Sequence, residues 1–145
     1  MPRVKYWSPA VLWMVMIFLM STDSFSAPNT SSVIEPLIRL LFPAASAGTV
    51  QMVHGALRKA GHVIEYFVLG LLYFRAFRGG SPVRWQGRWA ALSVLAVLAY
   101  AATDEFHQSF APSRTASVID VAIDAAGGLF SQALLFLRHR CGRSA

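Results

Sequence analysis

ATDEFHQSFAPSRTASVIDVAIDAAGGLF, residues 102–130, places four of the chain's seven acidic residues within sequence that is otherwise apolar enough for a membrane. Asp104 and Glu105 directly follow one long apolar run. Asp120 and Asp124 lie inside a second one. An acidic side chain costs roughly 2.5 to 3.5 kcal/mol at the centre of a membrane helix. If the two runs are membrane spans, the four acids therefore indicate a functional site.

The composition indicates a small integral membrane protein. The 145 residues are 55% hydrophobic and 14% charged, whereas about 25% of residues are charged in a typical soluble domain. The net charge is +6, but the 13 Lys and Arg residues flank apolar runs and form no basic face interleaved with aromatic residues. We therefore expect membrane lipids as partners and no nucleic acid. The single cysteine, Cys141, can form no internal disulfide.

The first apolar run predicts a membrane-spanning helix over residues 7–22. A basic segment precedes it, and it carries Trp7 and Trp13, the kind of residue that membrane interfaces favour. Small residues follow near Ala27, so a cleaved signal peptide is the alternative. Cleavage would remove this span and leave three. In both cases we expect the segment that follows to be exported.

Residues 33–42 predict a short amphipathic helix in the loop after this run. Val33, Leu37 and Leu41 recur at helical spacing, and Glu35 lies on the opposite face. The segment is too short to cross a bilayer. We expect it either at the outer membrane interface or as a packed cap over the bundle.

The second expected span, residues 61–77, has an unusually polar outer turn. At about 100° per residue, four side chains share an arc of about 120° and can face one site: Lys59, His62, Glu65 and Tyr66. The alternative is purely structural. Lys59 would then extend to the lipid headgroups, and His62 would pair with Glu65 one helical turn away.

Two further spans complete the predicted fold. The third covers residues 89–107. Its apolar part is shorter than the roughly 20 residues that a hydrocarbon core needs, so we expect the helix to continue through Asp104 and Glu105. The fourth covers residues 117–137. We therefore predict an all-α, polytopic membrane protein: a single domain, residues 1–145, that forms a bundle of four transmembrane helices with a short interfacial helix in the first outer loop.

The distribution of Lys and Arg predicts the orientation through the positive-inside rule. Nine of the 13 share one side: Arg3, Lys5, Arg75, Arg78, Arg84, Arg88, Arg138, Arg140 and Arg143. The other side has Arg39, Arg58, Lys59 and Arg114. We expect both termini in the cytoplasm and the chain in a bacterial cytoplasmic membrane. The polar ends of the second, third and fourth spans then converge on the exported face.

Asp120 and Asp124 lie one turn apart on the fourth span, next to small residues that include Gly127. Close helix packing explains the small residues, but it does not explain two aspartates. Adjacent carboxylates repel each other when both are ionised. Asp124, the deeper one, is therefore expected to hold a proton or to meet a cation such as Arg114, Lys59 or a metal ion.

Two polar segments carry spaced patterns of functional residues. KAGHVIEYFVLGLL, residues 59–72, has the pattern K-x-x-H-x-x-x-Y, and TDEFHQSFAPSRTASVIDVAIDAAGG, residues 103–128, has D-E-x-x-Q-x-x-x-x-x-R-x-x-x-x-x-D. Together they resemble the paired signature of the VanZ-like family of small bacterial membrane proteins. The matching positions are Lys59, His62, Tyr66, Asp104, Glu105, Gln108, Arg114, Asp120 and the glycine pair that begins at Gly127. Asp124 departs from the family pattern, in which Asn is common at this place.

The resemblance implies a four-helix membrane protein, and some members of the family are linked to resistance to glycopeptides, notably teicoplanin. It further implies a polar site on the exported face. The ligand of that site would be an anionic envelope lipid headgroup or a cell-wall precursor.

We expect the polar residues to form an outward-facing pocket with His62, Glu105 and Asp120 at its centre. Tyr66 and Gln108 would orient a ligand. The two cations at the rim, Lys59 and Arg114, suit a phosphate or a carboxylate. The full set of expected ligand-binding residues is Lys59, His62, Glu65, Tyr66, Asp104, Glu105, Gln108, Arg114, Asp120 and Asp124.

Two other classes of function compete with ligand binding. His62, Glu105 and Asp120 supply the imidazole and carboxylates of a membrane-embedded hydrolase, with or without a metal ion. No recognised metal signature is present, and we expect neither a metal site nor a cofactor. The other class is a structural membrane protein in which Arg114 and Lys59 neutralise the acids and no ligand binds. A channel is disfavoured because four helices leave little room for a pore.

Overall fold

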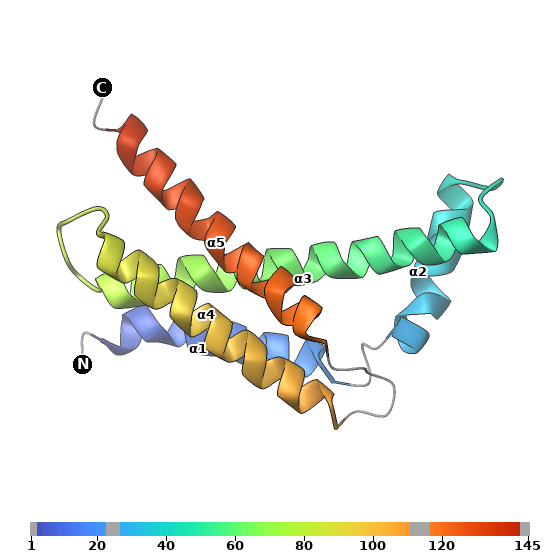
Figure 1. Cartoon of the computed structure of the whole chain (residues 1–145), viewed down its shortest axis with the longest axis horizontal. Helices are drawn as coiled ribbons and strands as arrows, with labels where there is room; N and C mark the ends of the chain where they lie inside the picture. Colours follow the sequence, from blue (N-terminus) through green and yellow to red (C-terminus); the bar gives the residue numbers. More distant parts are fainter. Residues whose placement is uncertain (1–2, 23–26, 111–116, 143–145) are drawn as a thin grey trace.

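The computed structural model describes residues 3–22, 27–110 and 117–142, and these residues form α-helices with short connections. The helices are α1 (Val4–Met20), α2 (Ala27–Leu41), α3 (Ala47–Arg78), α4 (Gly87–Gln108) and α5 (Val118–Cys141). The predicted all-α fold is confirmed. The long helix α3 is central: α1, α4 and α5 pack along its C-terminal half, and α2 packs against its N-terminal half (Figure 1).

The helix α3 begins at Ala47, well before the predicted start of the second span at residue 61. The Ser46 side chain caps it and accepts a hydrogen bond at 3.2 Å from the N–H three residues further on. The helix α2 supports its first turns, because His54 is buried and its Nε2 atom lies 3.3 Å from Thr30 Oγ1. The hydrophobic pattern did not predict this half of the helix, because its glycines have weak helix propensity. The Ser46 cap and packing against α2 stabilise it instead.

The other expected spans match helices to within a few residues. The predicted ranges 7–22, 89–107 and 117–137 correspond to α1, α4 and α5. As predicted, α4 continues through Asp104 and Glu105, so both acids lie in its last turns.

Among the described residues, α3, α4 and α5 are long and apolar enough to cross a membrane. The helix α1 is apolar but shorter, with 17 residues. The count of four spans therefore stays a prediction, as does an interfacial position for α2. Large apolar side chains cover the outside of the bundle, for example Leu12 at 70% exposed, Leu95 at 60% and Phe130 at 60%. An apolar exterior of this kind suits contact with lipid.

The helix α1 is part of the bundle core. Ala10 and Ile17 have no exposed surface, and the Trp13 indole N–H donates a hydrogen bond to the Glu65 carbonyl oxygen of α3 at 2.9 Å. A chain cleaved near Ala27 would lose these contacts. The mass of the intact protein isolated from membranes decides between the predicted span and the cleaved signal peptide.

Glycines bring α5 unusually close to its neighbours. A methyl group at Gly127 would overlap the Val63 carbonyl oxygen of α3, and one at Gly128 would overlap the Val97 side chain of α4. The close helix packing predicted for the small residues of the fourth span is thus confirmed. It also places Asp124, one turn earlier on α5, directly against α3.

Candidate functional site

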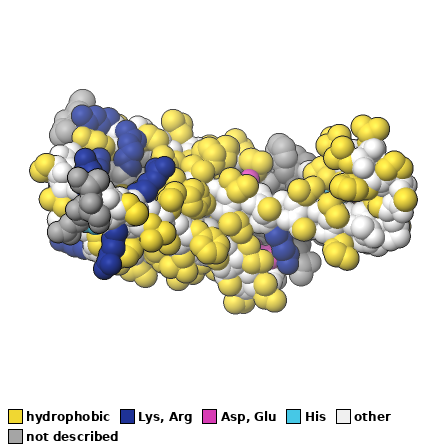
Figure 2. Space-filling view, turned by 90° about the horizontal axis from the view of Figure 1, so that it is seen from above, with side chains coloured by type: hydrophobic (Ala, Val, Ile, Leu, Met, Phe, Trp, Pro, Cys, Tyr) yellow, Lys and Arg dark blue, Asp and Glu magenta, His cyan; other side chains and the backbone are white. Residues whose placement is uncertain are grey.

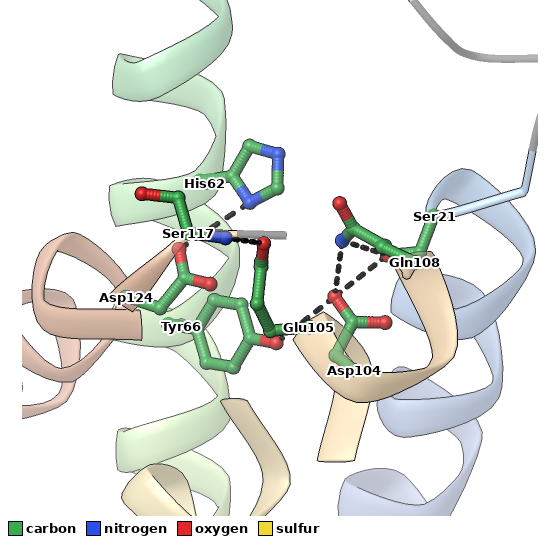
Figure 3. A network of polar contacts seen from close by, with 8 residues as sticks. All are labelled: Ser21, His62, Tyr66, Asp104, Glu105, Gln108, Ser117 and Asp124. Atoms are coloured by element: carbon green, nitrogen blue, oxygen red, sulfur yellow. Dashed lines mark hydrogen bonds and ion pairs between the residues drawn. The ribbon is translucent and has the colours of Figure 1, made fainter. Parts of the chain in front are cut away.

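Polar side chains from four helices meet inside the bundle, as Figure 3 shows. The hydrogen bonds and the ion-pair contact described below bring together polar residues of the expected second, third and fourth spans, whereas their position on the exported face stays a prediction. The residues are Ser21 after α1, His62 and Tyr66 of α3, Asp104, Glu105 and Gln108 of α4, Ser117 before α5, and Asp124 of α5.

Asp104 accepts the most hydrogen bonds of the acids in this group, all of them at one oxygen, while its Oδ1 atom is buried without a hydrogen-bond partner among the described residues. Its Oδ2 atom accepts hydrogen bonds from Ser21 Oγ at 2.7 Å, Gln108 Nε2 at 2.9 Å and Tyr66 OH at 3.3 Å. The residue is 3% exposed. Three neutral donors from α4, α3 and the end of α1 therefore hold this carboxylate, and it links these three helices.

Glu105 connects α4 to the start of α5. Its Oε1 atom accepts a hydrogen bond from the backbone N–H of Ser117 at 2.5 Å. Ser117 is the N-cap residue of α5, and its own side chain accepts a hydrogen bond from the Ile119 N–H at 3.2 Å. A carboxylate at a helix N-terminus is stabilised by the free N–H groups and by the helix dipole. Glu105 thus fixes the position at which α5 begins.

His62 of α3 and Asp124 of α5 form an ion-pair contact across the helix interface. The Nδ1 and Oδ1 atoms lie 3.3 Å apart, although their orientation is not that of a hydrogen bond. Asp124 is 1% exposed, whereas 24% of the His62 side chain is exposed. Among the described residues, the ion-pair partner of Asp124 is therefore His62 and not Lys59, while the expected proton, Arg114 and metal ion stay predictions.

Two small pockets share His62 and Arg58. The first, of about 130 Å³, lies between α3 and α5, and its polar lining is Arg58, Lys59, His62, Asp120 and Asp124. The second, of about 150 Å³, lies between α3, α2 and the end of α1, and its polar lining is Ser21, Thr30, Arg58, His62 and Glu65. Pockets of this size have room for a few water molecules or one charged group, not for a whole drug-sized ligand.

The structure divides the predicted site residues into two groups. His62, Asp120, Asp124 and Lys59 border the first pocket, and Glu65 borders the second. The second group does not line these two pockets and makes the hydrogen bonds described above: Asp104, Glu105, Tyr66 and Gln108. Arg114, expected at the rim, lies outside the described residues.

Sequence reasoning missed two residues of this region. Arg58 borders both pockets, and its position next to Lys59 among the few cations of this side was a signal for it. Ser21 donates to Asp104, and no pattern in the sequence marks it. His107, another histidine of this region, packs its ring against Phe18, with ring centroids 4.4 Å apart.

Metal-binding residue types do not cluster in the described part of the chain: no three His, Cys, Asp or Glu side chains lie close enough together to hold an ion. His62 and Asp124 form a pair, whereas a tetrahedral zinc site takes three or four protein ligands. The arrangement is therefore a histidine–carboxylate pair beside a pocket.

Comparison with known protein families identifies the family of this chain. The family model described as VanZ/LLP1 matches residues 6–139. The matched segment begins in α1 and ends in α5, so it includes every described helix. The resemblance found in the motifs around His62 and Asp104 is thereby confirmed. No curated protein and no solved structure matches this chain.

Proposed function

This chain belongs to the VanZ/LLP1 family of membrane proteins, and from that premise we propose that its polar site binds the anionic headgroup of an envelope lipid or of a lipid-linked cell-wall precursor. The observation that carries the proposal is the pocket between α3 and α5, which combines Arg58 and Lys59 with the His62–Asp124 pair. A role in glycopeptide resistance, including resistance to teicoplanin, would follow if the ligand is a cell-wall precursor.

The charges and size of this pocket favour a phosphate or carboxylate group. Asp124 is paired with His62, which leaves Arg58 and Lys59 to face the single remaining acid, Asp120. A guanidinium binds two oxygens of such an anion side by side, and an ammonium adds a point charge. A volume of about 130 Å³ admits the charged group alone. The rest of the ligand would have to remain outside.

The surroundings of the pocket suit an apolar chain on the ligand. Leu57 precedes Arg58 on α3 and is 52% exposed, and Ile119 precedes Asp120 on α5 and is 67% exposed. Both would face lipid if α3 and α5 span the membrane. An acyl or polyprenyl chain could therefore stay in the bilayer while its headgroup enters the pocket.

The proposal requires the pocket to face the exported side of the bacterial cytoplasmic membrane, with both termini in the cytoplasm. An alkaline phosphatase fusion after Ser113 is expected to be active, and one after Arg84 is expected to be silent. The reverse pattern would overturn this orientation.

Binding of a lipid-linked phosphate tests the proposal directly. Native mass spectrometry of the full-length protein would compare a polyprenyl phosphate with the matching polyprenol. We expect the phosphate form to bind more tightly and Arg58→Gln to weaken it about 5-fold, the effect of one charged contact. Arg39→Gln, which removes an exposed cation of α2 outside both pockets, is the matched control. Equal binding of phosphate and alcohol would contradict the proposal.

Arg114 provides an independent test of the sequence prediction. If it borders the site, Arg114→Gln is expected to weaken binding of the polyprenyl phosphate as Arg58→Gln does. A protein that accumulates normally in the membrane and keeps its affinity would remove Arg114 from the site.

A second candidate function is hydrolysis of the bound headgroup, and the His62–Asp124 contact favours it. Asp124 lies at Nδ1, so the Nε2 atom on the far side of the ring is directed away from it (Figure 3). An aspartate beside Nδ1 offsets the positive charge that the imidazole gains when Nε2 accepts a proton. Nε2 would take a proton from a water molecule whose oxygen attacks the headgroup phosphorus while the P–O bond to the polyprenyl part breaks, and the same proton would then pass from Nε2 to the departing oxygen.

His62→Gln separates binding from hydrolysis. If the site only binds, wild type releases no product from the polyprenyl phosphate or from a matching pyrophosphate. If it hydrolyses, wild type releases phosphate, and the variant still binds while turnover falls about 100-fold or more. Elemental analysis of the same preparation shows whether a metal ion takes part.

A further inference from the structure

A larger pocket lies at the opposite end of the bundle from the polar site. It has a volume of about 670 Å³ and opens between the start of α1, the end of α3 and the first turns of α4. Its lining includes Arg3, Arg78 and Arg88 together with Tyr6, Trp7 and Trp89. The volume falls within the range of roughly 300 to 1,000 Å³ that is usual for small-molecule sites.

The three arginines of this pocket have no acidic partner nearby in the sequence. All seven Asp and Glu residues lie between positions 23 and 124, and none lies between Glu65 and Asp104. Figure 2 shows most of the visible Lys and Arg side chains gathered at this end of the molecule, with the visible acidic side chains farther along. The Nε atom of Arg78 is buried and has no hydrogen-bond acceptor among the described residues.

The helix ends add to the positive potential of the pocket. The helices α1 and α4 both begin here, and neither has an acidic residue in its first turn or a side-chain cap at its N-cap residue. Their N-terminal dipoles therefore favour an anion. The helix α3 ends here, and its C-terminal dipole offsets part of the charge of Arg78. Arg3 and Arg88 remain without such compensation.

The rest of the lining is suited to the boundary between headgroups and acyl chains. Trp7 packs edge-on against Phe77, with ring centroids 5.1 Å apart, and Trp89 packs in the same way against Phe74 at 6.1 Å. Tryptophan and tyrosine favour this depth of a membrane because one part of the ring is apolar and another is polar. An occupant should therefore have both an anionic head and an apolar tail.

We propose that this basic pocket binds the headgroup of an anionic phospholipid, at a site separate from the polar site around His62. Arg3 and Arg88 contact the phosphate, and Trp7 and Trp89 lie against the start of the acyl chains. Basic pockets between membrane helices are a known way of holding such lipids. The proposal depends on neither the orientation of the protein nor its function at the polar site.

Lipid binding to the full-length protein in a non-ionic detergent tests the proposal. Native mass spectrometry would compare phosphatidylglycerol, which is anionic, with phosphatidylcholine, which has no net charge. We expect phosphatidylglycerol to bind at least about tenfold more tightly. The double variant Arg3→Gln, Arg88→Gln should lose roughly 30-fold in affinity, the product of two charged contacts. Equal affinity for both lipids in wild type would overturn the proposal.

Two matched variants show whether the pocket or the general charge is responsible. Arg84→Gln with Arg138→Gln removes the same charge at the same end, from exposed residues outside the pocket, and should change affinity less than about twofold. Arg3→Lys with Arg88→Lys keeps the charge and should retain most of the binding. An equal loss in the Arg84 and Arg138 variant would overturn the proposal.

Two further measurements separate the source of the phosphate and the two sites. Displacement of phosphatidylglycerol by millimolar sn-glycerol 3-phosphate would show a site for a free phosphate compound and overturn a lipid site. Arg58→Gln should not remove the phosphatidylglycerol binding that depends on Arg3 and Arg88. If Arg58→Gln abolishes it and the Arg3 and Arg88 variant does not, the lipid occupies the polar site and this inference is wrong.

Discussion

The two ends of the bundle treat charged residues differently. Where α4 ends and α5 begins, each buried acid has a partner from another part of the chain. At the opposite end, three arginines line a pocket, and no acid lies close to them in the sequence. Asp104 is held by three donors, Glu105 by the Ser117 N–H, and Asp124 by His62. The pocket beside the acids measures about 130 Å³, and the pocket among the arginines measures about 670 Å³.

This contrast indicates two different uses of charged side chains. A group that is satisfied inside the protein stabilises the fold and holds its neighbours in place before any ligand arrives. A cation without an internal partner instead requires its counter-charge from outside, from lipid phosphates or from solution. The acids should therefore matter most for stability, and the arginines for what the protein binds.

Asp104→Ala should have the largest effect on stability. It leaves the Ser21, Tyr66 and Gln108 donors without their shared acceptor, and we expect a loss of about 3 to 5 kcal/mol in the free energy of unfolding. Thermal unfolding in detergent, followed by circular dichroism, measures it. Thr103→Ala on the same helix is the control, because Thr103 is exposed and its hydroxyl donates a hydrogen bond within its own helix, to the Ala99 carbonyl. Similar losses in both variants would refute a special role for Asp104.

Gly127→Ala should have the next largest effect. The added methyl group meets the α3 backbone, so α5 must move away from α3, and we expect a loss of about 1 to 3 kcal/mol. Gly61→Ala is a matched control, since the same change on α3 meets nothing within 4 Å and should stabilise the helix by up to about 1 kcal/mol. Two equal effects in the same unfolding experiment would show that the close approach of α5 is not important.

The His62–Asp124 contact should give a smaller, coupled effect. In a double-mutant cycle with His62→Gln and Asp124→Asn, we expect an interaction energy of about 1 kcal/mol, because one partner is partly exposed. Additive single effects would mean that the two side chains do not interact in the membrane protein. In that case the proposed catalytic role of His62 would lose its support.

Arg88→Gln should have the smallest effect on stability. Arg88 is exposed and lines the basic pocket, and the sequence around it has no acid to pair with, so the free energy of unfolding in lipid-free detergent should change by less than about 0.5 kcal/mol. Added phosphatidylglycerol should stabilise wild type more than the variant. A large loss without lipid would show that Arg88 is part of the internal framework after all.

The sequence predicted the elements of the fold better than their contacts. Hydrophobic periodicity located α4 and α5 and carried α4 through its acids, because an apolar run too short for a bilayer had to continue. It did not find the first half of α3, which depends on the Ser46 cap and on packing against α2. Periodicity records the burial of one face, so a segment held mainly by a neighbouring helix is hard to see.

The site shows the same division. Composition predicted an all-α membrane protein, and the motifs around His62 and Asp104 resembled this family. The sequence also named the buried acids Asp104, Glu105 and Asp124, since membrane-grade sequence makes each acid conspicuous, but it did not name the buried uncharged residues Ser21, His54, Ser93 and Gln132. Only the tertiary structure decided the pairing: Asp124 meets His62, Glu105 meets Ser117, and Ser21 reaches Asp104 from 83 positions away. Spacing along one helix shows which side chains share a face. Which face of another helix lies opposite is determined by close packing, here by glycines that bring α5 against α3.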